Sequence, residues 1–138
     1  MKTDIAKTKL INKVKFFGKV KSKKAAKLLN RADALLITLL DRKVFSYTVP
    51  GKLQNYLALG KPILGMINGE ANKIINNNLG LACKSSDYLN LAKNVLKIKK
   101  MSIKQRNTIS KNCIKYASVN FSRNILLHKL RNEYIQKI

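Results

Sequence analysis

Pro50-Gly-Lys-Leu-Gln-Asn-Tyr-Leu-Ala-Leu-Gly-Lys-Pro-Ile-Leu-Gly-Met66 is the stretch that decides the fold. Its first half is amphipathic and predicts a helix that begins at Gly51 and ends at Leu59. Gly60 follows in the position where helices commonly place a residue with positive φ. The short apolar run over residues 62–66 is typical of a buried strand in a parallel sheet. The stretch therefore predicts one helix-to-strand unit of an α/β protein.

The same alternation extends in both directions from this stretch. Further short apolar runs predict strands over residues 14–17, 34–39 and 79–83. Helical patterns follow these strands over residues 22–30, over residues 70–77 and from Ser86 or Asp87 to Lys97, with Ser22 as the expected N-cap of the first. Repeated strand-and-helix units build a parallel sheet that has helices on its faces. We expect an α/β fold with a Rossmann-like parallel sheet flanked by helices.

The pattern changes after Lys100, where no further strand is indicated. Ser102-Ile-Lys-Gln105 has the spacing of a capping box and predicts a helix that reaches about Ser118. Ser122 is the expected cap of another helix that runs to the C-terminus. The chain is therefore expected to end in two helices.

The charge of the chain is strongly positive and needs an explanation. Lysine and arginine total 29 against six aspartate and glutamate residues, which gives a formal net charge of +23. Such a balance favours a polyanionic partner. However, the lysines are spread along the chain, and lysine, asparagine and isoleucine share A/T-rich codons, so genome composition also accounts for them. The aromatic residues form no stacking platform, so we expect no nucleic-acid partner, and a basic nucleic-acid-binding module stays as an alternative.

Several other classes of protein find no support in the sequence. No apolar run approaches the roughly 20 residues that a membrane span requires, and no hydrophobic signal core precedes Val14, so a cytoplasmic location is expected. Cys83 and Cys113 lie far apart and are interpreted as reduced packing residues. His128 is the single histidine, and no acidic pair or histidine cluster is available, so we expect neither a metal nor a cofactor.

The connection from Leu40 to Pro50 is the longest without an assigned element, and it is the candidate binding loop. Ligands of open parallel sheets bind beyond the carboxyl ends of the strands, where helix N-termini favour phosphate. Pro50 and Gly51 let a ligand approach the backbone closely, and Lys52 adds a positive charge. The alternative is that the Pro-Gly step only ends a strand-to-helix turn and that Lys52 is one more solvated lysine.

A longer stretch within this region resembles a known family. Val44-Phe-Ser-Tyr-Thr-Val-Pro-Gly-Lys-Leu-Gln-Asn-Tyr-Leu-Ala-Leu-Gly-Lys-Pro-Ile-Leu64 resembles the donor-site segment of glycosyltransferase family four, whose members are group 1 enzymes. Shorter matches lie around it: Val14-Lys-Phe-Phe-Gly-Lys-Val20, Ala32-Asp-Ala-Leu35, Gly69-Glu70 and Phe121-Ser-Arg123. The likeness extends from about Val14 to Leu130. It is greatest to the subgroup that builds bacterial surface polysaccharides, including aminodeoxysugar transferases for lipopolysaccharide O-antigen and capsule.

The resemblance implies a particular place in a larger architecture. Members of the family have two Rossmann-like domains that face a cleft, the GT-B arrangement, and this chain resembles only the second, C-terminal domain. Residues 1–100 would form a partial nucleotide-sugar-binding domain and residues 101–138 a C-terminal helical segment. Residues 4–12 would represent a helix that follows an additional strand in the family. We therefore expect either a fragment, whose acceptor-binding half is missing or on another chain, or a non-catalytic remnant.

The resemblance also implies roles for individual residues. Gly18 and Lys19 would lie by the diphosphate, and Gly69 and Glu70 would border the ligand side of the sheet. For Glu70, a purely structural role at a helix N-terminus stays an equal alternative. The segment that would enclose the phosphates and the nucleoside consists of Thr48, Val49, Pro50, Gly51, Lys52 and Leu53.

The chain departs from the family pattern at three positions in and around this segment. Many members have two glutamates, one near the transferred sugar and one on the ribose; here Tyr47 and Asn55 take those positions. An amide still accepts a hydrogen bond from a ribose hydroxyl but loses about 1 to 2 kcal/mol of charge-assisted binding. Gly51 stands where the subgroup commonly has serine. Weaker donor binding is therefore expected, and no residue is assigned as catalytic.

The implied reaction transfers a glycosyl unit, a hexosyl unit for example, with retention of the anomeric configuration. Lys19 and Lys52 would stabilise the departing diphosphate, so positioning and charge would supply the mechanism. A UDP-sugar is the favoured donor and a GDP-sugar the second choice, with a saccharide or lipid-linked acceptor. The basic surface would also suit peripheral contact with the cytoplasmic membrane, because each nearby cation contributes about 1 kcal/mol of attraction.

Overall fold

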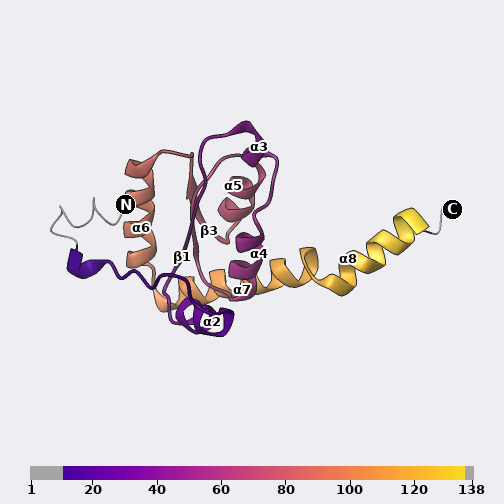
Figure 1. Ribbon diagram of the computed structural model, residues 1–138, viewed down its shortest axis with the longest axis horizontal. Helices are drawn as coiled ribbons and strands as arrows, with labels where there is room; N and C mark the ends of the chain where they lie inside the picture. Colours follow the sequence, from indigo (N-terminus) through magenta and orange to yellow (C-terminus); the bar gives the residue numbers. More distant parts are fainter. Residues whose placement is uncertain (1–10, 136–138) are drawn as a thin grey trace.

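A computed structural model describes residues 11–135 of the 138-residue chain. It is an α/β structure with a three-stranded parallel sheet in the order β1 (Leu35–Thr38), β2 (Ile63–Met66) and β3 (Gly80–Cys83) (Figure 1). In the register, Leu35 lies opposite Ile63 of β2, and Ile63 lies opposite Gly80 of β3. The expected fold class is therefore confirmed, and three of the four expected strands form with ends within one residue of the prediction.

Helices cover both faces of this sheet. Figure 1 shows α4 (Gly51–Ala58) and α5 (Gly69–Asn76) on one side of the strands and α6 (Tyr88–Lys100) on the other. The α4 and α5 side holds the main core, because the apolar residues of both helices recur at helical spacing and face the strands. The largest fully buried side chains are Leu53, Leu57, Ile63, Ile67, Ile75, Leu79 and Cys113.

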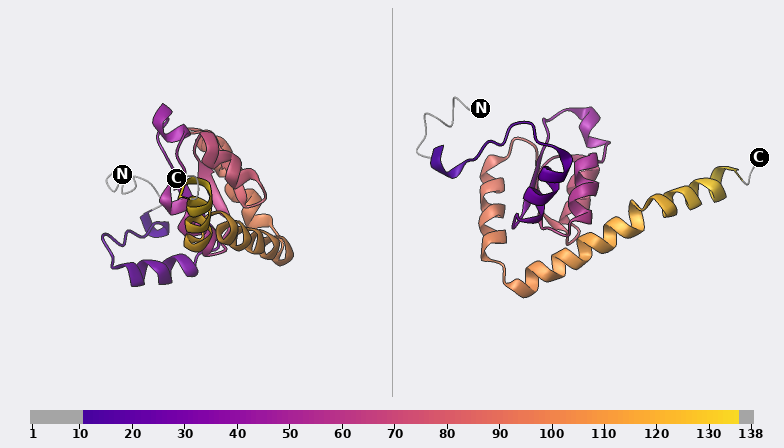
Figure 2. Two further views of the ribbon diagram at one scale, coloured as in Figure 1. Left: turned by 90° about the vertical axis from the view of Figure 1, so that its right-hand side faces the viewer. Right: turned by 60° about the horizontal axis from the view of Figure 1, so that its bottom comes forward.

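The C-terminal part begins with α7 (Ile103–Asn120), which packs against α4. The predicted capping box is present: Gln105 N–H donates to Ser102 Oγ at 3.2 Å, and Ser102 N–H donates to Gln105 Oε1 at 2.8 Å. Then α8 (Arg123–Leu130) and a π-helix, η2 (Arg131–Ile135), extend away from the sheet (Figures 1 and 2). No residue of α8 is buried. Two C-terminal helices were expected, and the second changes to π geometry instead of continuing as one α-helix.

The N-terminal part corrects one prediction. After a 3₁₀ turn, η1 (Ile11–Lys13), residues 14–20 form no strand, so the strand expected over residues 14–17 is wrong. A strand needs a neighbour for its backbone hydrogen bonds, and no other described strand pairs with this segment. Val14 and Phe17 are 40% and 46% exposed. Most of the helix expected over residues 4–12 lies outside the described residues.

The helix termini also refine the predictions. In α2 (Ser22–Asn30), Ser22 is the first helical residue and Lys21 is at the N-cap, so Ser22 is not the predicted cap. Ser122 does stand at the N-cap of α8, but its side chain makes no capping bond. Asp87 caps α6 by accepting from Asn90 N–H at 3.0 Å. Gly60 has a φ of +63°, as predicted for a residue that ends a helix.

Candidate functional site

The loops at the carboxyl ends of the three strands lie at one end of the sheet. The loop after β1 contains a short helix, α3 (Lys43–Ser46), within the connection for which no element was predicted. The loop after β2 leads into α5, and the loop after β3 leads into α6. This is the end at which parallel sheets bind ligands. The three loops are therefore the frame of the candidate site.

A single asparagine joins these three loops. Asn68 Nδ2 donates to Asp41 Oδ1 in the loop after β1 at 2.8 Å. Asn68 Oδ1 accepts from the backbone N–H of Ser85, in the loop after β3, at 3.0 Å. Because the amide donates on one side and accepts on the other, it fixes the relative positions of the loops. This residue was not among the predicted site residues.

Two further asparagines continue the row along α5. Asn72 Nδ2 donates to the carbonyl oxygens of Ile67 at 2.8 Å and Cys83 at 3.1 Å, at the ends of β2 and β3. Asn76 binds both backbone groups of Ala82: its Oδ1 accepts from the N–H at 2.8 Å, and its Nδ2 donates to the carbonyl at 3.2 Å. Residues spaced by four share one helix face. The row of Asn68, Asn72 and Asn76 therefore ties α5 to the sheet.

Gly69 brings the loop after β1 close to the first turn of α5. Its φ is +72°, a conformation that favours glycine. A Cβ atom added there would overlap the backbone of Ser46 in α3. Any side chain at position 69 would therefore separate α3 from α5. The predicted residues Gly69 and Thr48 consequently belong to neighbouring segments, since Thr48 lies two residues beyond Ser46.

The segment from Thr48 to Leu53 forms the start of α4. Thr48 Oγ1 donates to Phe45 O at 3.3 Å, and Val49 packs against the core. Pro50 is the N-cap, with extended backbone angles. Among the described residues, no acceptor receives the N–H groups of Gly51 or Lys52. This turn therefore offers backbone donors and the positive end of a helix dipole.

The side chains of this segment divide between the surface and the core. Lys52 and Asn55 are exposed and lie three residues apart on α4, so they share a face of the helix. Leu53 is completely buried, and its N–H donates to Pro50 O at 2.8 Å. Leu53 thus anchors the helix, whereas Lys52 and Asn55 are the side chains that are accessible to a ligand.

The other predicted residues are placed differently. Glu70, in the first turn of α5, pairs with Lys73 at 3.3 Å, and both side chains are mostly exposed. Gly18 has a φ of +63° and is exposed, as is Lys19. The segment from η1 toward α2 starts on the α6 side of the sheet (Figure 1). Within residues 11–135, no hydrogen bond joins Gly18 or Lys19 to the α4 turn.

The surroundings at the end of β3 favour the ionised carboxylate of Asp87 and the neutral thiol of Cys83. Hydrogen bonds from the Asn90 side chain and backbone hold the pKa of Asp87 below its ordinary value. Burial, followed by the nearby charge of Asp87, raises the pKa of the Cys83 thiol. Cys83 is thus protonated at neutral pH and is not a nucleophile. A cavity of about 480 Å³ lies here, lined by Ala82, Cys83, Lys84, Asp87, Asn90 and Asn94.

Comparison with protein families decides the assignment of this arrangement. The model of the family described as glycosyl transferases group 1 matches residues 1–116. The chain belongs to this family. Comparison with curated proteins and with solved structures finds no match. The α/β fold agrees with the Rossmann-like sheet of a group 1 glycosyl transferase, and the family resemblance drawn from the sequence is confirmed at this level.

Family membership gives the general activity of the chain as a group 1 glycosyl transferase. It indicates glycosyl transfer, and therefore binding of a nucleotide-sugar donor and an acceptor. In the part of the chain that the structure describes, no three His, Cys, Asp or Glu residues gather as a metal site would require. Within residues 11–135, no helix has both the length and the apolar character needed to cross a membrane.

Proposed function

We propose that the first turn of α4 binds the diphosphate of a nucleotide-sugar donor. The observation that supports this most directly is the pair of uncommitted N–H groups at Gly51 and Lys52, beside the exposed ammonium group of Lys52. A helix N-terminus with free donors suits a phosphate group. The close approach of Gly69 to Ser46 and the bond between Asn68 and Asp41 tie the loop that leads into this turn to the start of α5.

The proposed chemistry depends on position and charge. When the glycosyl bond to the donor phosphate breaks, negative charge develops on the departing diphosphate. The N–H groups and Lys52 stabilise that charge without a metal ion. Asn55, one turn further along α4, accepts a hydrogen bond from a ribose hydroxyl. Lys19 would join this site only if residues 14–20 moved toward α4, so we assign Lys52 the larger share.

The donor, the acceptor and the stereochemistry of the proposed reaction are those that the resemblance to the polysaccharide subgroup implies. We assign transfer of a hexosyl or other glycosyl unit, with retention, from a UDP-sugar, or less favourably a GDP-sugar. The acceptor is a saccharide, in lipid-linked form, in the synthesis of surface polysaccharide. Residues 1–100 act as the donor-binding unit and residues 101–138 as a helical extension. The match of the family model to residues 1–116 supports the donor-binding part of this assignment.

Contact with an anionic membrane is part of the same proposal. Lysine and arginine are exposed throughout residues 12–31, with no acidic residue among them. Val14 and Phe17 are exposed in the same segment. Cations attract an anionic leaflet and apolar side chains enter its interface, so this segment suits an enzyme whose acceptor is lipid-linked.

Calorimetric titration of the purified chain with UDP and GDP tests the proposal. UDP is expected to bind saturably and more tightly than GDP. Lys52→Ala should weaken binding about tenfold, since a charged hydrogen bond is lost. Lys111→Ala removes an exposed lysine from α7 and is the matched control, with no expected change. Asn55→Glu should tighten binding because it restores a carboxylate for the ribose.

Two other outcomes of these titrations would contradict the proposed donor site. Absence of saturable binding to both nucleotides would contradict a working donor site and favour a non-catalytic remnant. Tighter binding to single-stranded RNA than to UDP, with a steep loss of affinity as salt rises, would instead identify a nucleic-acid-binding module.

A further inference from the structure

A groove lies along one face of α7, at the opposite end of the sheet from the donor loops. Leu79, which immediately precedes β3, forms part of its wall. The groove consists of two adjacent cavities of about 330 Å³ and 520 Å³, which we call the smaller and the larger lobe. Both volumes lie in the range of about 300 to 1,000 Å³ that is common for small-molecule sites. Asn78 and Asn112 line both lobes, and Asn112 Nδ2 donates to Asn78 O at 3.3 Å where the lobes meet.

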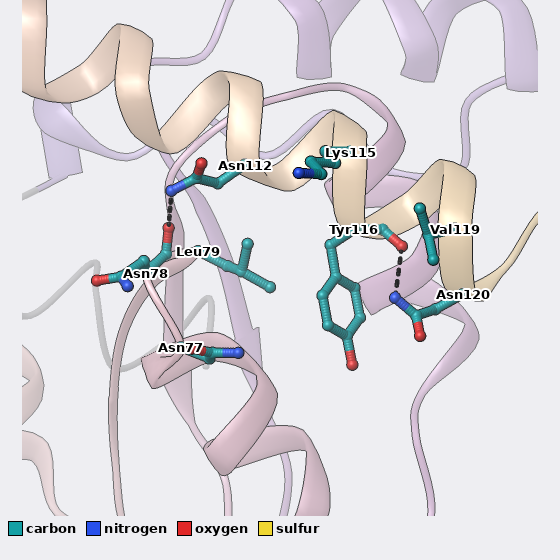
Figure 3. A pocket seen from close by; sticks show the side chains of 8 residues that line it. All are labelled: Asn77, Asn78, Leu79, Asn112, Lys115, Tyr116, Val119 and Asn120. Atoms are coloured by element: carbon teal, nitrogen blue, oxygen red, sulfur yellow. Dashed lines mark hydrogen bonds between the residues drawn. The ribbon is translucent and has the colours of Figure 1, made fainter.

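Amide groups dominate the polar lining of the smaller lobe (Figure 3). Asn112 and Asn120 each use Nδ2 in a bond to a backbone carbonyl, which leaves their Oδ1 atoms as acceptors. The side-chain amides of Asn77 and Asn78 make no hydrogen bond with other described residues. The lobe therefore presents both donors and acceptors that are not used within the fold.

Apolar surface completes the smaller lobe. Figure 3 shows the Tyr116 ring extending from α7 toward the α5 side of the pocket. The ring packs against Phe121 with 5.9 Å between the centroids, which holds its orientation. The Tyr116 hydroxyl has no hydrogen-bond partner among residues 11–135. Leu79 and Val119 supply aliphatic surface nearby. An aromatic face beside aliphatic groups and amides suits a ligand that has both C–H faces and hydroxyl edges.

The charge of the groove narrows the class of ligand. No carboxylate lines either lobe, so the groove offers a metal cation no charged oxygen. Each lobe has one lysine, Lys104 in the larger and Lys115 in the smaller. This lining therefore suits a neutral or an acidic ligand better than a cationic one. At about 1.5 Å per helical residue, the lining from Lys104 to Asn120 extends over roughly 24 Å, which suits a ligand of several repeated units.

We propose that this groove binds a saccharide chain, separately from the donor site. Hydroxyl groups of a sugar both donate and accept hydrogen bonds, as the uncommitted amides require. The ring of Tyr116 packs against the C–H face of one unit, and the two lysines pair with acidic units where the chain has them. A polymer held here has a raised effective concentration at the enzyme, so successive additions to the same chain are favoured.

The test uses the full chain and three linear hexasaccharide probes in calorimetric titrations: chitohexaose, cellohexaose and a hyaluronan hexasaccharide. At least one should bind saturably. Asn77→Ala and Tyr116→Phe, which keeps the ring, should each weaken that binding by roughly three- to tenfold, as expected for one lost hydrogen bond. Asn107→Ala, an exposed amide on another face of α7, should leave binding unchanged.

UDP titrations of the same variants separate this site from the proposed donor site. Variants of the groove should bind UDP as the unaltered chain does, and Lys52→Ala should bind the hexasaccharide normally. The proposal is overturned if none of the three probes binds at millimolar concentration, or if Asn107→Ala weakens binding as much as Asn77→Ala. Displacement of the bound probe by micromolar single-stranded RNA would overturn it too, because the groove would then serve nucleic acid.

Discussion

Two regions of the molecule differ in both lysine content and structure. Residues 51–83, which we call the packed body, hold fully buried side chains such as Leu53, Leu57 and Ile63. Residues 12–31, which we call the basic arm, include no residue classed as buried. The basic arm has seven lysines among its 20 residues and the packed body three among 33, although both regions contain aliphatic residues. The difference shows that aliphatic residues form a core where they recur at the spacing of helices and strands and few charges interrupt them.

The largest contrast between the two regions is expected from leucine truncation. Leu57→Ala should destabilise the protein by about 2 to 5 kcal/mol, because it leaves a cavity among fully buried neighbours. Leu28→Ala, in the half-buried face of α2, should cost less than about 1 kcal/mol. Urea unfolding followed by circular dichroism measures both. Equal losses would show that the basic arm packs as tightly as the body.

A smaller contrast is expected between two asparagines at equivalent exposed positions. Asn76→Ala removes both bonds to the backbone of Ala82 and should cost about 1 to 2 kcal/mol. Asn30→Ala, at the end of α2, removes a side chain that has no bond to another described residue, and should change stability by less than about 0.5 kcal/mol. Hydrogen exchange at the Ala82 N–H should accelerate only in Asn76→Ala. Unchanged exchange there would refute the role of Asn76.

Serine residues at two helix starts sharpen the comparison further. Ser102→Ala removes a capping box and should cost about 1 kcal/mol. Ser22→Ala, in the basic arm, should be neutral or slightly stabilising, since Ser22 is already helical and makes no capping bond. Thermal unfolding of the two variants distinguishes them. A larger loss from Ser22→Ala would restore the role that the sequence pattern predicted for it.

The smallest effect is expected on the stability of the fold at acidic pH, when Asp87 is replaced. The pKa of Asp87 is lower in the folded protein than the ordinary 3.8, chiefly because Asn90 donates to the carboxylate. A lowered carboxyl pKa stabilises the fold at pH above the ordinary value, and this stabilisation is lost as the pH falls through the folded pKa. Asp87→Asn keeps a capping side chain but cannot titrate. Its melting temperature should therefore fall less steeply than that of the unaltered chain between about pH 5 and pH 2, and a parallel fall would exclude Asp87 as a contributor.

Patterns that repeat along the chain predicted the fold well. The apolar runs that became β1, β2 and β3 each stand between two helical patterns, so their local and tertiary environments agree. Residues 14–17 have the same apolar character but lack a paired neighbour among the described strands, and sequence alone does not reveal pairing. The four residues of α3 are too few to show a helical period.

The candidate site was only partly accessible to sequence reasoning. The turn at Gly51 and Lys52 follows from the chemistry of a Pro-Gly step before a helix, and the structure places it at the ligand end of the sheet. Asn68, which joins the loops there, was not predicted, because asparagine is frequent throughout the chain and a single one does not stand out. The repeated spacing of four from Asn68 to Asn72 and from Asn72 to Asn76 was the available signal, because a regular row on one helix face is unexpected from composition alone.

The bonds between Asn76 and Ala82 also limit how copies of the chain can associate. The amide occupies the N–H and the carbonyl of Ala82, two of the backbone groups that β3 would otherwise offer to an added strand. Among residues 11–135, β1 pairs only with β2, so its outer edge is available. Two copies that joined edge to edge would therefore pair more readily through β1 than through β3, where Asn76 blocks the backbone groups of Ala82.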